Sequence, residues 1–271
     1  MKKSIFYSHI LTMSRQESIS VEDALAFARS VGYEGLDTDW AELREDPDGF
    51  LEQIGAADMK IASVNVFCGF PRGFSNEEMT HILQTIARCG CTKAMIIPGF
   101  YTENGDTQAE TDRILYGLRE TCSIAKDMGL TVSIEDFDNR LSPCGRLQDI
   151  RKLVDEVPEL MHTLDTGNYA FFQEDVLSAL SLLGDRIVHV HLKDRSLTPF
   201  LTGEEPILSI SGTPLYSAPV GWGFIPIDTC INALARIGYN GYMSAEFFGA
   251  ADMRAYITKS AEKIDALLSH I

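Results

Sequence analysis

The sequence predicts an α/β protein with a single domain over residues 1–271, folded as a closed (β/α)8 TIM barrel. Three observations support this fold class: a length that suits one barrel, eight short apolar runs, and a longer amphipathic stretch behind most of them. Alternating strands and helices are typical of a parallel sheet, and eight such units favour a closed barrel. An open doubly wound sheet is the alternative, but no glycine-rich phosphate fingerprint follows the first strand.

The expected elements follow one another in a regular order along the chain. Strands are expected at 4–9, 35–38, 60–66, 93–98, 131–136, 161–165, 187–192 and 242–247, where β-branched and apolar residues gather. Helices are expected at 20–32, 46–58, 76–90, 108–129, 175–184 and 227–238, the one at 46–58 with the weakest pattern. Ser20 and Asp228 occupy N-cap positions, and Gly32 and Gly129 follow helices as C-cap glycines do. The seventh strand is followed by an extended loop at about 195–225.

The composition limits the kind of partner that the protein can have. The chain has 23 basic and 39 acidic residues, a formal charge of −16, which repels nucleic-acid phosphates and anionic lipids. The six cysteines form no CxxC pair, no apolar run is long enough for a membrane span, and the N-terminal segment lacks the pattern of a signal peptide. We therefore expect a cytoplasmic protein with free thiols that acts on a small molecule.

Four of the expected strands carry a metal-binding side chain at or near the carboxyl end, where TIM-barrel active sites lie. Side chains alternate between two faces along a strand, so apolar residues that face the helices leave the polar ones facing the lumen. The polar set is Glu135, Asp165, His191 and Glu246. His189 shares the face of His191 one layer deeper, and we expect it to be packed in the lumen and hydrogen-bonded to a polar neighbour.

The joint pattern indicates a divalent metal site, although each residue alone is more often a loop residue or a helix cap. Clustered carboxylates in a barrel core repel one another and are desolvated, at a cost of several kcal/mol, unless a cation neutralises them. Three carboxylates and one imidazole suit Mn²⁺, Mg²⁺ or Co²⁺, with Zn²⁺ as a further option. The lack of thiolates in the set argues against a structural zinc site.

The segments that carry these residues are similar to a known superfamily. SIED, LDTGN, VHVHLKD and SAEFF, with the near-motif PVGWGFIPID, resemble the xylose-isomerase-like TIM barrels of the sugar-phosphate isomerase/epimerase superfamily, from about Gly32 to the C-terminus. This group includes ketose 3-epimerases, hydroxypyruvate isomerase, inosose dehydratase and endonuclease IV. The resemblance implies that Glu135, Asp165, His191 and Glu246 are the metal ligands and that the two glutamates are the acid/base pair. It also implies a homo-oligomer.

Two positions depart from the superfamily pattern. Asn168 replaces the histidine of the usual DTGH, and Trp222 replaces the glutamate of the usual GEG. Neither departure removes a proposed metal ligand. Both bear on the identity of the substrate.

Five further residues are candidates for contacts with a substrate. Asn65 faces the lumen if the alternation of its strand holds, and His9 is expected at the end of the first strand, with a buried structural role as the alternative. Lys193 follows the seventh strand with its side chain expected off the lumen face. The full candidate set is Asn65, Asn168, His9, Lys193 and Trp222.

These observations favour a metal-dependent isomerase or epimerase that acts on a small sugar, keto acid or sugar phosphate. Glu135 and Glu246 would take and return a proton next to a carbonyl group, through a metal-bound enediolate. The ligand set alone does not choose among outcomes, so an inosose-type dehydratase and a hydroxypyruvate isomerase remain open.

Two further functions are weaker alternatives. An endonuclease IV-like phosphodiesterase is disfavoured by the acidic charge and by the small number of histidines. A non-catalytic sugar-binding barrel is disfavoured because a binding protein does not need two opposed bases. The favoured partner is thus a small carbohydrate, with no nucleic acid and no membrane.

Overall fold

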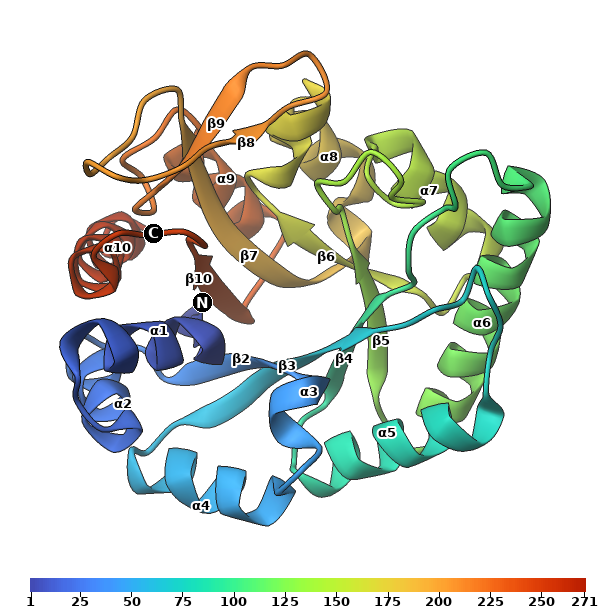
Figure 1. Ribbon diagram of the computed structural model, residues 1–271, viewed down its shortest axis with the longest axis horizontal. Helices are drawn as coiled ribbons and strands as arrows, with labels where there is room; N and C mark the ends of the chain where they lie inside the picture. The colour runs from blue at the N-terminus through green and yellow to red at the C-terminus, as the bar shows by residue number, and fades with distance from the viewer.

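The computed structural model describes residues 1–271 and contains a closed barrel of eight parallel strands surrounded by helices (Figure 1). The barrel strands are β1 (Lys2–Phe6), β2 (Gly35–Asp39), β3 (Lys60–Phe67), β4 (Lys93–Ile97), β5 (Thr131–Glu135), β6 (Met161–Asp165), β7 (Ile187–Ser196) and β10 (Tyr242–Glu246). Strands β1 to β7 pair in sequence order, and β10 pairs in parallel with both β1 and β7, which closes the barrel. The predicted single-domain (β/α)8 TIM barrel is confirmed.

The helices cover the outside of this barrel. They are α1 (Tyr7–Glu17), α2 (Val21–Ser30), α3 (Trp40–Leu43), α4 (Pro47–Ala56), α5 (Asn76–Arg88), α6 (Thr107–Asp127), α7 (Leu147–Glu156), α8 (Val176–Leu183), α9 (Ile227–Arg236) and α10 (Met253–Leu268), with short 3-10 turns η1 (Asn168–Phe172) and η2 (Gly184–Arg186). The predicted cap at Ser20 is confirmed, because its hydroxyl accepts a hydrogen bond from Asp23 N at 3.0 Å. No helix combines the length and the hydropathy that a membrane crossing needs.

The hydrophobic core fills the layer between the strands and the helices. On β5, Val132 and Ile134 belong to this core, whereas Ser133 faces the lumen, where its hydroxyl lies 2.7 Å from that of Thr163 on β6. The alternation of faces that the sequence predicts therefore holds along this strand. It turns the carboxylate of Glu135, two residues beyond Ser133, toward the lumen.

The first strand differs from its expected bounds. Strand β1 ends at Phe6, and the chain turns into α1 at Tyr7. The expectation that His9 ends a strand is wrong, because Tyr7, His9, Ile10 and Met13 form the buried side of this helix. The FYSHI run is apolar enough to extend a strand, but its continuation has helical spacing.

The region after β7 contains an antiparallel ribbon beside the barrel. Residues Asp194–Ser196 at the end of β7 pair with Tyr216–Ala218 of β9 (Pro214–Ala218), and β9 pairs with β8 (Ile207–Leu208). The ribbon is the orange hairpin in Figure 1, next to α8. The segment expected as a long loop at about 195–225 follows Ser196 and is partly ordered as strands. All six cysteines are free thiols.

Asp194 holds the last part of this loop against the barrel. Its Oδ2 accepts hydrogen bonds from Gly221 N at 2.9 Å and Gly223 N at 2.8 Å, and its Oδ1 accepts from Ile225 N at 3.1 Å. A Cβ atom on Gly223 would lie 2.2 Å from both Arg195 O and Asp194 Oδ1. Only glycine therefore lets the backbone approach the carboxylate this closely.

We predict that Gly223→Ala lowers the free energy of unfolding by about 1–3 kcal/mol, because the added methyl group forces the loop away from β7. The measurement is urea unfolding followed by circular dichroism. Gly55→Ala in α4 is the matched control, since nothing lies within 4 Å of its added Cβ. It should be neutral or stabilising by up to about 1 kcal/mol. Equal effects of the two substitutions would show that the close approach of Gly223 to Asp194 does not matter for stability.

Candidate functional site

The four predicted ligands meet at the carboxyl end of the barrel. Glu135, Asp165 and Glu246 end β5, β6 and β10, and His191 lies in β7 in register with Asp165. All four side chains are buried, and each offers a ligand atom within 4.8 Å of those of the others. The predicted convergence of these residues is therefore present in the structure.

His191 is the centre of this cluster. Its Nδ1 lies 3.3 Å from Glu246 Oε2 and is in short contact with Glu135 Oε1, while its Nε2 lies 3.0 Å from Asp37 Oδ2. Burial lowers the pKa of the His191 imidazole, but Glu135 and Asp37 raise it, and the net shift is upward. The pKa of Glu135 is raised, mainly by burial. The site thus concentrates negative charge around one imidazole.

Lys193 reaches into the same cluster. Its Nζ lies 2.5 Å from Glu246 Oε1 and 3.3 Å from Asp165 Oδ2, and it donates a hydrogen bond to Asn168 Oδ1 at 2.8 Å. The expectation that Lys193 projects off the lumen face is wrong, because β7 stays extended to Ser196 and residues two apart share a face. Burial lowers the pKa of Lys193, but Asp165 and Glu246 raise it by more, and the net shift is upward. The ammonium therefore stays charged.

Asp165 presents an unbonded oxygen to the cluster. Its Oδ1 accepts from Gly167 N at 2.7 Å and Asn168 N at 2.8 Å, which makes DTGN a tight turn around the carboxylate. Its Oδ2 is buried and accepts no hydrogen bond. Burial raises the pKa of Asp165 to about 7, because the charged form lacks solvation. The neighbour of Asp165 Oδ2 on this side is the Lys193 ammonium at 3.3 Å, an ion pair without hydrogen-bond geometry. A carboxylate oxygen that accepts no hydrogen bond, beside two further carboxylates and an imidazole, fits a divalent cation.

A cavity of about 300 Å³ opens over these groups. Its floor is polar, with Asp39, Asn65, Asp138 and Asn168 beside Glu135, His191, Lys193 and Glu246. Its walls are apolar and consist of Phe6, Phe67, Met95, Ile97, Phe137 and Phe248. Phe67 is 60% and Phe248 52% exposed, so both lie at the mouth. The cavity suits a small ligand with polar groups on one side and a C–H surface on the other.

Asn65 and Asn168 line the cavity, as predicted. Asn65 Nδ2 donates to Asp39 Oδ1 at 3.2 Å, and its Oδ1 has no partner. Asn168 Nδ2 donates to the backbone oxygen of Asp136 at 2.7 Å. The amide of Asn65 therefore has a free acceptor for a ligand, whereas that of Asn168 is held at both ends, by Asp136 and by Lys193.

His9 and Trp222 do not line the cavity. His9 Nε2 accepts a hydrogen bond from Phe247 N at 3.0 Å, and its ring stacks on the Phe247 ring, so its position fits the structural alternative. Trp222 is 53% exposed, and the ammonium of Lys259 lies 4.5 Å from its ring centre. The structure brings neither residue to a ligand bound over the cluster.

Sequence reasoning missed Asp37, which lies in the lumen beneath His191. Its Oδ2 lies 2.7 Å from His189 Nε2, which confirms that His189 is a packed lumen histidine with a polar partner. Burial raises the pKa of Asp37, but the two histidines lower it, and the net shift is downward. Asp37 and Asp39 share a face of the GLDTD strand, so the alternation that revealed the other ligands also applied here.

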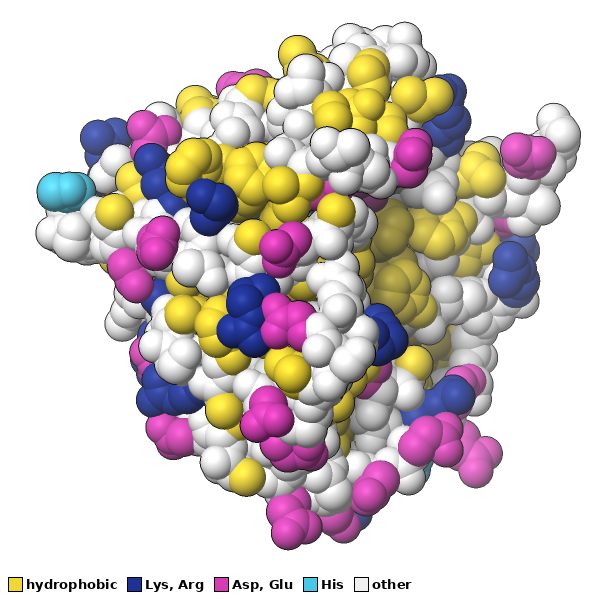
Figure 2. All heavy atoms as spheres, turned by 60° about the vertical axis from the view of Figure 1, so that its left-hand side comes forward, with side chains coloured by type: hydrophobic (Ala, Val, Ile, Leu, Met, Phe, Trp, Pro, Cys, Tyr) yellow, Lys and Arg dark blue, Asp and Glu magenta, His cyan; other side chains and the backbone are white.

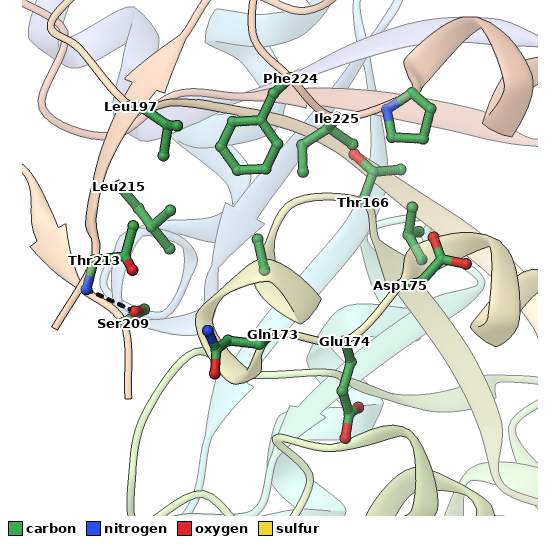
Figure 3. Close-up of a pocket in the computed structure, with 13 residues that line it drawn as sticks. Thr166, Gln173, Glu174, Asp175, Leu197, Ser209, Thr213, Leu215, Phe224 and Ile225 are labelled. Atoms are coloured by element: carbon green, nitrogen blue, oxygen red, sulfur yellow. Dashed lines mark hydrogen bonds between the residues drawn. The ribbon is translucent and has the colours of Figure 1, made fainter. Parts of the chain in front are cut away.

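A second cavity, of about 370 Å³, lies between the β8–β9 ribbon and the segment from η1 to α8 (Figure 3). Leu197 and Phe224 face Gln173 and Glu174 across it. Its two acids have structural roles: Glu174 accepts from Leu147 N at 2.7 Å, and Asp175 caps α8 by accepting from Leu177 N at 3.1 Å. It contains none of the predicted catalytic or metal-binding residues.

The surface agrees with the acidic composition. On the face drawn in Figure 2, acidic side chains gather along the lower edge, and the basic side chains are scattered among them without forming a continuous basic surface. A hollow on this face shows mainly hydrophobic side chains in its walls. This face therefore lacks the basic stripe that binding to a phosphate backbone requires.

Comparison with known proteins assigns the family. Residues 25–268 match the family model of the xylose isomerase-like TIM barrel. The chain belongs to this family. Inosose dehydratase from Bacillus cereus (strain AH820) is 29% identical over 157 residues, which are 56% of this chain and 52% of that protein. The chain thus spans about half the length of the curated relatives it matches.

Several solved structures share the fold at low sequence identity. D-Psicose 3-epimerase from Clostridium cellulolyticum, solved with D-tagatose, has a TM-score of 0.72 at 15% identity, over 99% of both chains. The IOLI protein, solved with a bound zinc atom, has a TM-score of 0.74 at 17% identity, over 100% of this chain and 99% of that one. The proteins similar to this chain thus include an epimerase and a dehydratase, and the site has the donor set of a metal centre.

We predict that acid destabilises the protein in part through His9. Burial lowers the pKa of this imidazole to about 3, so the folded state keeps it neutral while the unfolded chain binds a proton below its usual pKa of 6.5. Its stabilising contribution is complete above pH 6.5 and decreases as the pH falls toward 3. The expected loss is about 2 kcal/mol between pH 7 and pH 5.

Urea unfolding at pH 7 and pH 5 measures this contribution. His9→Gln keeps an acceptor for Phe247 N but has no titrating group. The variant should therefore lose less stability than the wild type over this pH range. An unchanged pH dependence in the variant would show that His9 does not carry the effect.

Proposed function

We propose that the protein is a metal-dependent enzyme that moves a proton on the carbon next to a carbonyl group of a small carbohydrate, and so interconverts isomers or epimers. The observation that carries the proposal is the convergence of Glu135, Asp165, His191 and Glu246 at the carboxyl end of the barrel, where Glu135, His191 and Glu246 line a cavity. A protein that only binds a sugar has no need of three crowded, buried carboxylates, which are costly without a cation. Membership of the family supports the proposal.

Glu135 and Glu246 are the proposed acid/base pair. They come from β5 and β10, two strands that do not pair with each other, so they can approach a bound substrate from different sides. One carboxylate removes the proton and the other returns it, which inverts the carbon; return to the neighbouring carbon gives an isomer instead. Both side chains lie at the ends of strands, so the rigid barrel holds them in fixed positions beside a bound substrate.

The four ligands would hold the cation, and their neighbours would orient the substrate. When bound, a divalent cation supplies a Lewis acid that polarises the substrate carbonyl group. Lys193 lines the cavity and offsets the charge of Glu246. Asn65 Oδ1 is free to accept from a substrate hydroxyl group. The phenylalanine walls keep water away from the reacting carbon.

The charges of the cavity favour an unphosphorylated substrate. Lys193 is the one lysine or arginine among its lining residues, and it is paired with Glu246 and Asp165. Arg195, close by, is paired with Asp138 at 2.6 Å. A phosphate group would meet the carboxylates of Asp39 and Asp138 without a free cation.

Dehydration of a cyclic polyol ketone is a second candidate, and the 29% identity to inosose dehydratase favours it. The first step is the same removal of a proton next to the carbonyl group. The electron pair then expels the hydroxide from the adjacent carbon, and a proton from the protein converts it to water. Analysis of the product separates the two reactions, because dehydration gives an unsaturated ketone and isomerisation does not.

We predict that the enzyme loaded with Mn²⁺ incorporates deuterium from D₂O next to the carbonyl group of neutral ketoses or inososes, measured by mass spectrometry. Glu135→Gln and Glu246→Gln should each slow this exchange by roughly 10²- to 10⁴-fold, because the amide cannot take the proton. Glu174→Gln is the control, since Glu174 lies in the second cavity. It should exchange at the wild-type rate.

The outcomes of this experiment are distinct. Exchange on phosphorylated ketoses alone would contradict the substrate class. Metal binding without exchange on any of these compounds would contradict proton transfer and favour a binding protein. Loss of water from an inosose would select the dehydratase.

We also predict that Mn²⁺ raises the melting temperature of the wild type. A ligand at 100 times its Kd stabilises the folded state by about 2.7 kcal/mol. Asp165→Asn should remove most of this shift, because Asp165 Oδ2 is a proposed ligand atom. Asp175→Asn, at the N-cap of α8, should keep it. A shift of equal size in both variants would place the cation elsewhere.

A further inference from the structure

A second polar layer lies beneath the proposed metal ligands, with Asp37 at its centre. Asp37 Oδ2 lies 2.7 Å from His189 Nε2 and 3.0 Å from His191 Nε2, and its Oδ1 accepts a hydrogen bond from Ser244 Oγ. All four side chains are fully buried. The partners come from β7 and β10, so one carboxylate on β2 links three strands inside the barrel.

The two ring nitrogens of His191 face different sets of carboxylates. Nε2 faces Asp37, and Nδ1 faces Glu135 and Glu246. An ionised carboxylate can only accept hydrogen bonds, so the bond to Asp37 requires a proton on Nε2. A neutral imidazole then has its lone pair on Nδ1, directed at the other two carboxylates.

We propose that Asp37 is a positioning residue of the metal centre, which keeps the Nε2 proton on His191 and directs Nδ1 toward the cation. The inference rests on the metal centre of the proposed function but does not depend on proton transfer or on the substrate. A carboxylate that accepts the second N–H of a ligand histidine fixes the ring orientation and raises its basicity.

His189 and Ser244 hold Asp37 in this position. Each donates a hydrogen bond to the carboxylate, and the Ser244 hydroxyl lies 2.5 Å from that of Ser4 on β1. Three donors therefore converge on two carboxylate oxygens. An amide at this position has only one oxygen, so it would turn an N–H group toward a histidine ring or leave a donor unpaired. A carboxylate is the side chain that these surroundings require.

The main structural alternative is a second cation bound by Asp37, His189 and His191, which also have ligand atoms close together. Three observations favour the hydrogen-bonded arrangement. Neither Asp37 nor His189 lines the cavity, so the layer is closed to the ligand site. Ser244 already occupies the other oxygen of Asp37. The nitrogen-to-oxygen distances of 2.7 and 3.0 Å are those of ordinary hydrogen bonds.

Zn²⁺ binding to the full chain tests the inference. Affinity and stoichiometry are measured by competition with a chelator, and ¹⁵N NMR of the histidine rings shows which nitrogen binds zinc. The wild type should bind one ion per chain, with zinc on Nδ1 and a proton on Nε2 of His191. Asp37→Asn should weaken binding by about 10- to 100-fold. Asp175→Asn is the control and should bind as the wild type does.

Ser244→Ala supports the test if Asp37→Asn fails to fold. This variant removes one donor to Asp37 and leaves every proposed ligand in place. It should weaken zinc binding less than Asp37→Asn does, and it should broaden or shift the Nε2–H signal of His191. A merely structural role for Asp37 would lower the melting temperature without changing zinc affinity or the ring signals.

Four results would overturn the inference. They are wild-type zinc affinity in folded Asp37→Asn, zinc on Nε2 of His191, two ions per wild-type chain, and no zinc binding by the wild type. Failure of the proposed function gives a different result. In that case no carbohydrate exchanges deuterium, while Asp37→Asn still weakens the binding of zinc.

Discussion

The pairing of basic side chains on β7 with carboxylates from other strands is the interaction on which the site depends. His189, His191, Lys193 and Arg195 are alternate residues on one face of the strand, from the lumen to the rim. His189 contacts Asp37, and His191 contacts Asp37, Glu135 and Glu246. Lys193 contacts Asp165 and Glu246, and Arg195 contacts Asp138. A buried carboxylate without a partner costs several kcal/mol. The spacing of two residues along β7 therefore allows acids from distant parts of the chain to converge.

The proposed ligands of the site lie on strands, whereas part of the cavity wall lies in loops. The proposed ligands lie on strands, whose positions are fixed by pairing on both sides around the closed barrel. Phe137 and Phe248 lie in the loops just beyond β5 and β10, and Phe67 is the last residue of β3. Loop residues change the shape of a cavity without moving the ligands on the strands. In this chain, the shape of the cavity can therefore change at Phe137 and Phe248 without displacing the proposed ligands on the strands.

The alternation of side chains is enough to predict the strands and the four converging residues, because both depend on local sequence. It fails where residues far away in the sequence determine the end of a strand or the hydrogen-bond partner of a side chain. The pattern places His9 on a strand because the helical spacing of α1 starts within an apolar run. It misplaces Lys193 because pairing with β9 extends β7 beyond its apolar part. Applied to GLDTD, the alternation places Asp37 and Asp39 on one face, but it does not place Asp37 beside His189, which lies 152 residues away.

The departures from the superfamily motifs leave the four proposed metal ligands in place. Asn168, which stands where the resemblance expects a histidine, donates to Asp136 O through Nδ2 and accepts from Lys193 Nζ through Oδ1. Asn168 and Lys193 therefore act as a matched pair that fixes a cation beside Glu246. Trp222 lies outside the cavity, while the glycines on either side of it bind Asp194. Of the two substitutions, only Asn168 thus faces the cavity, and neither displaces a proposed ligand.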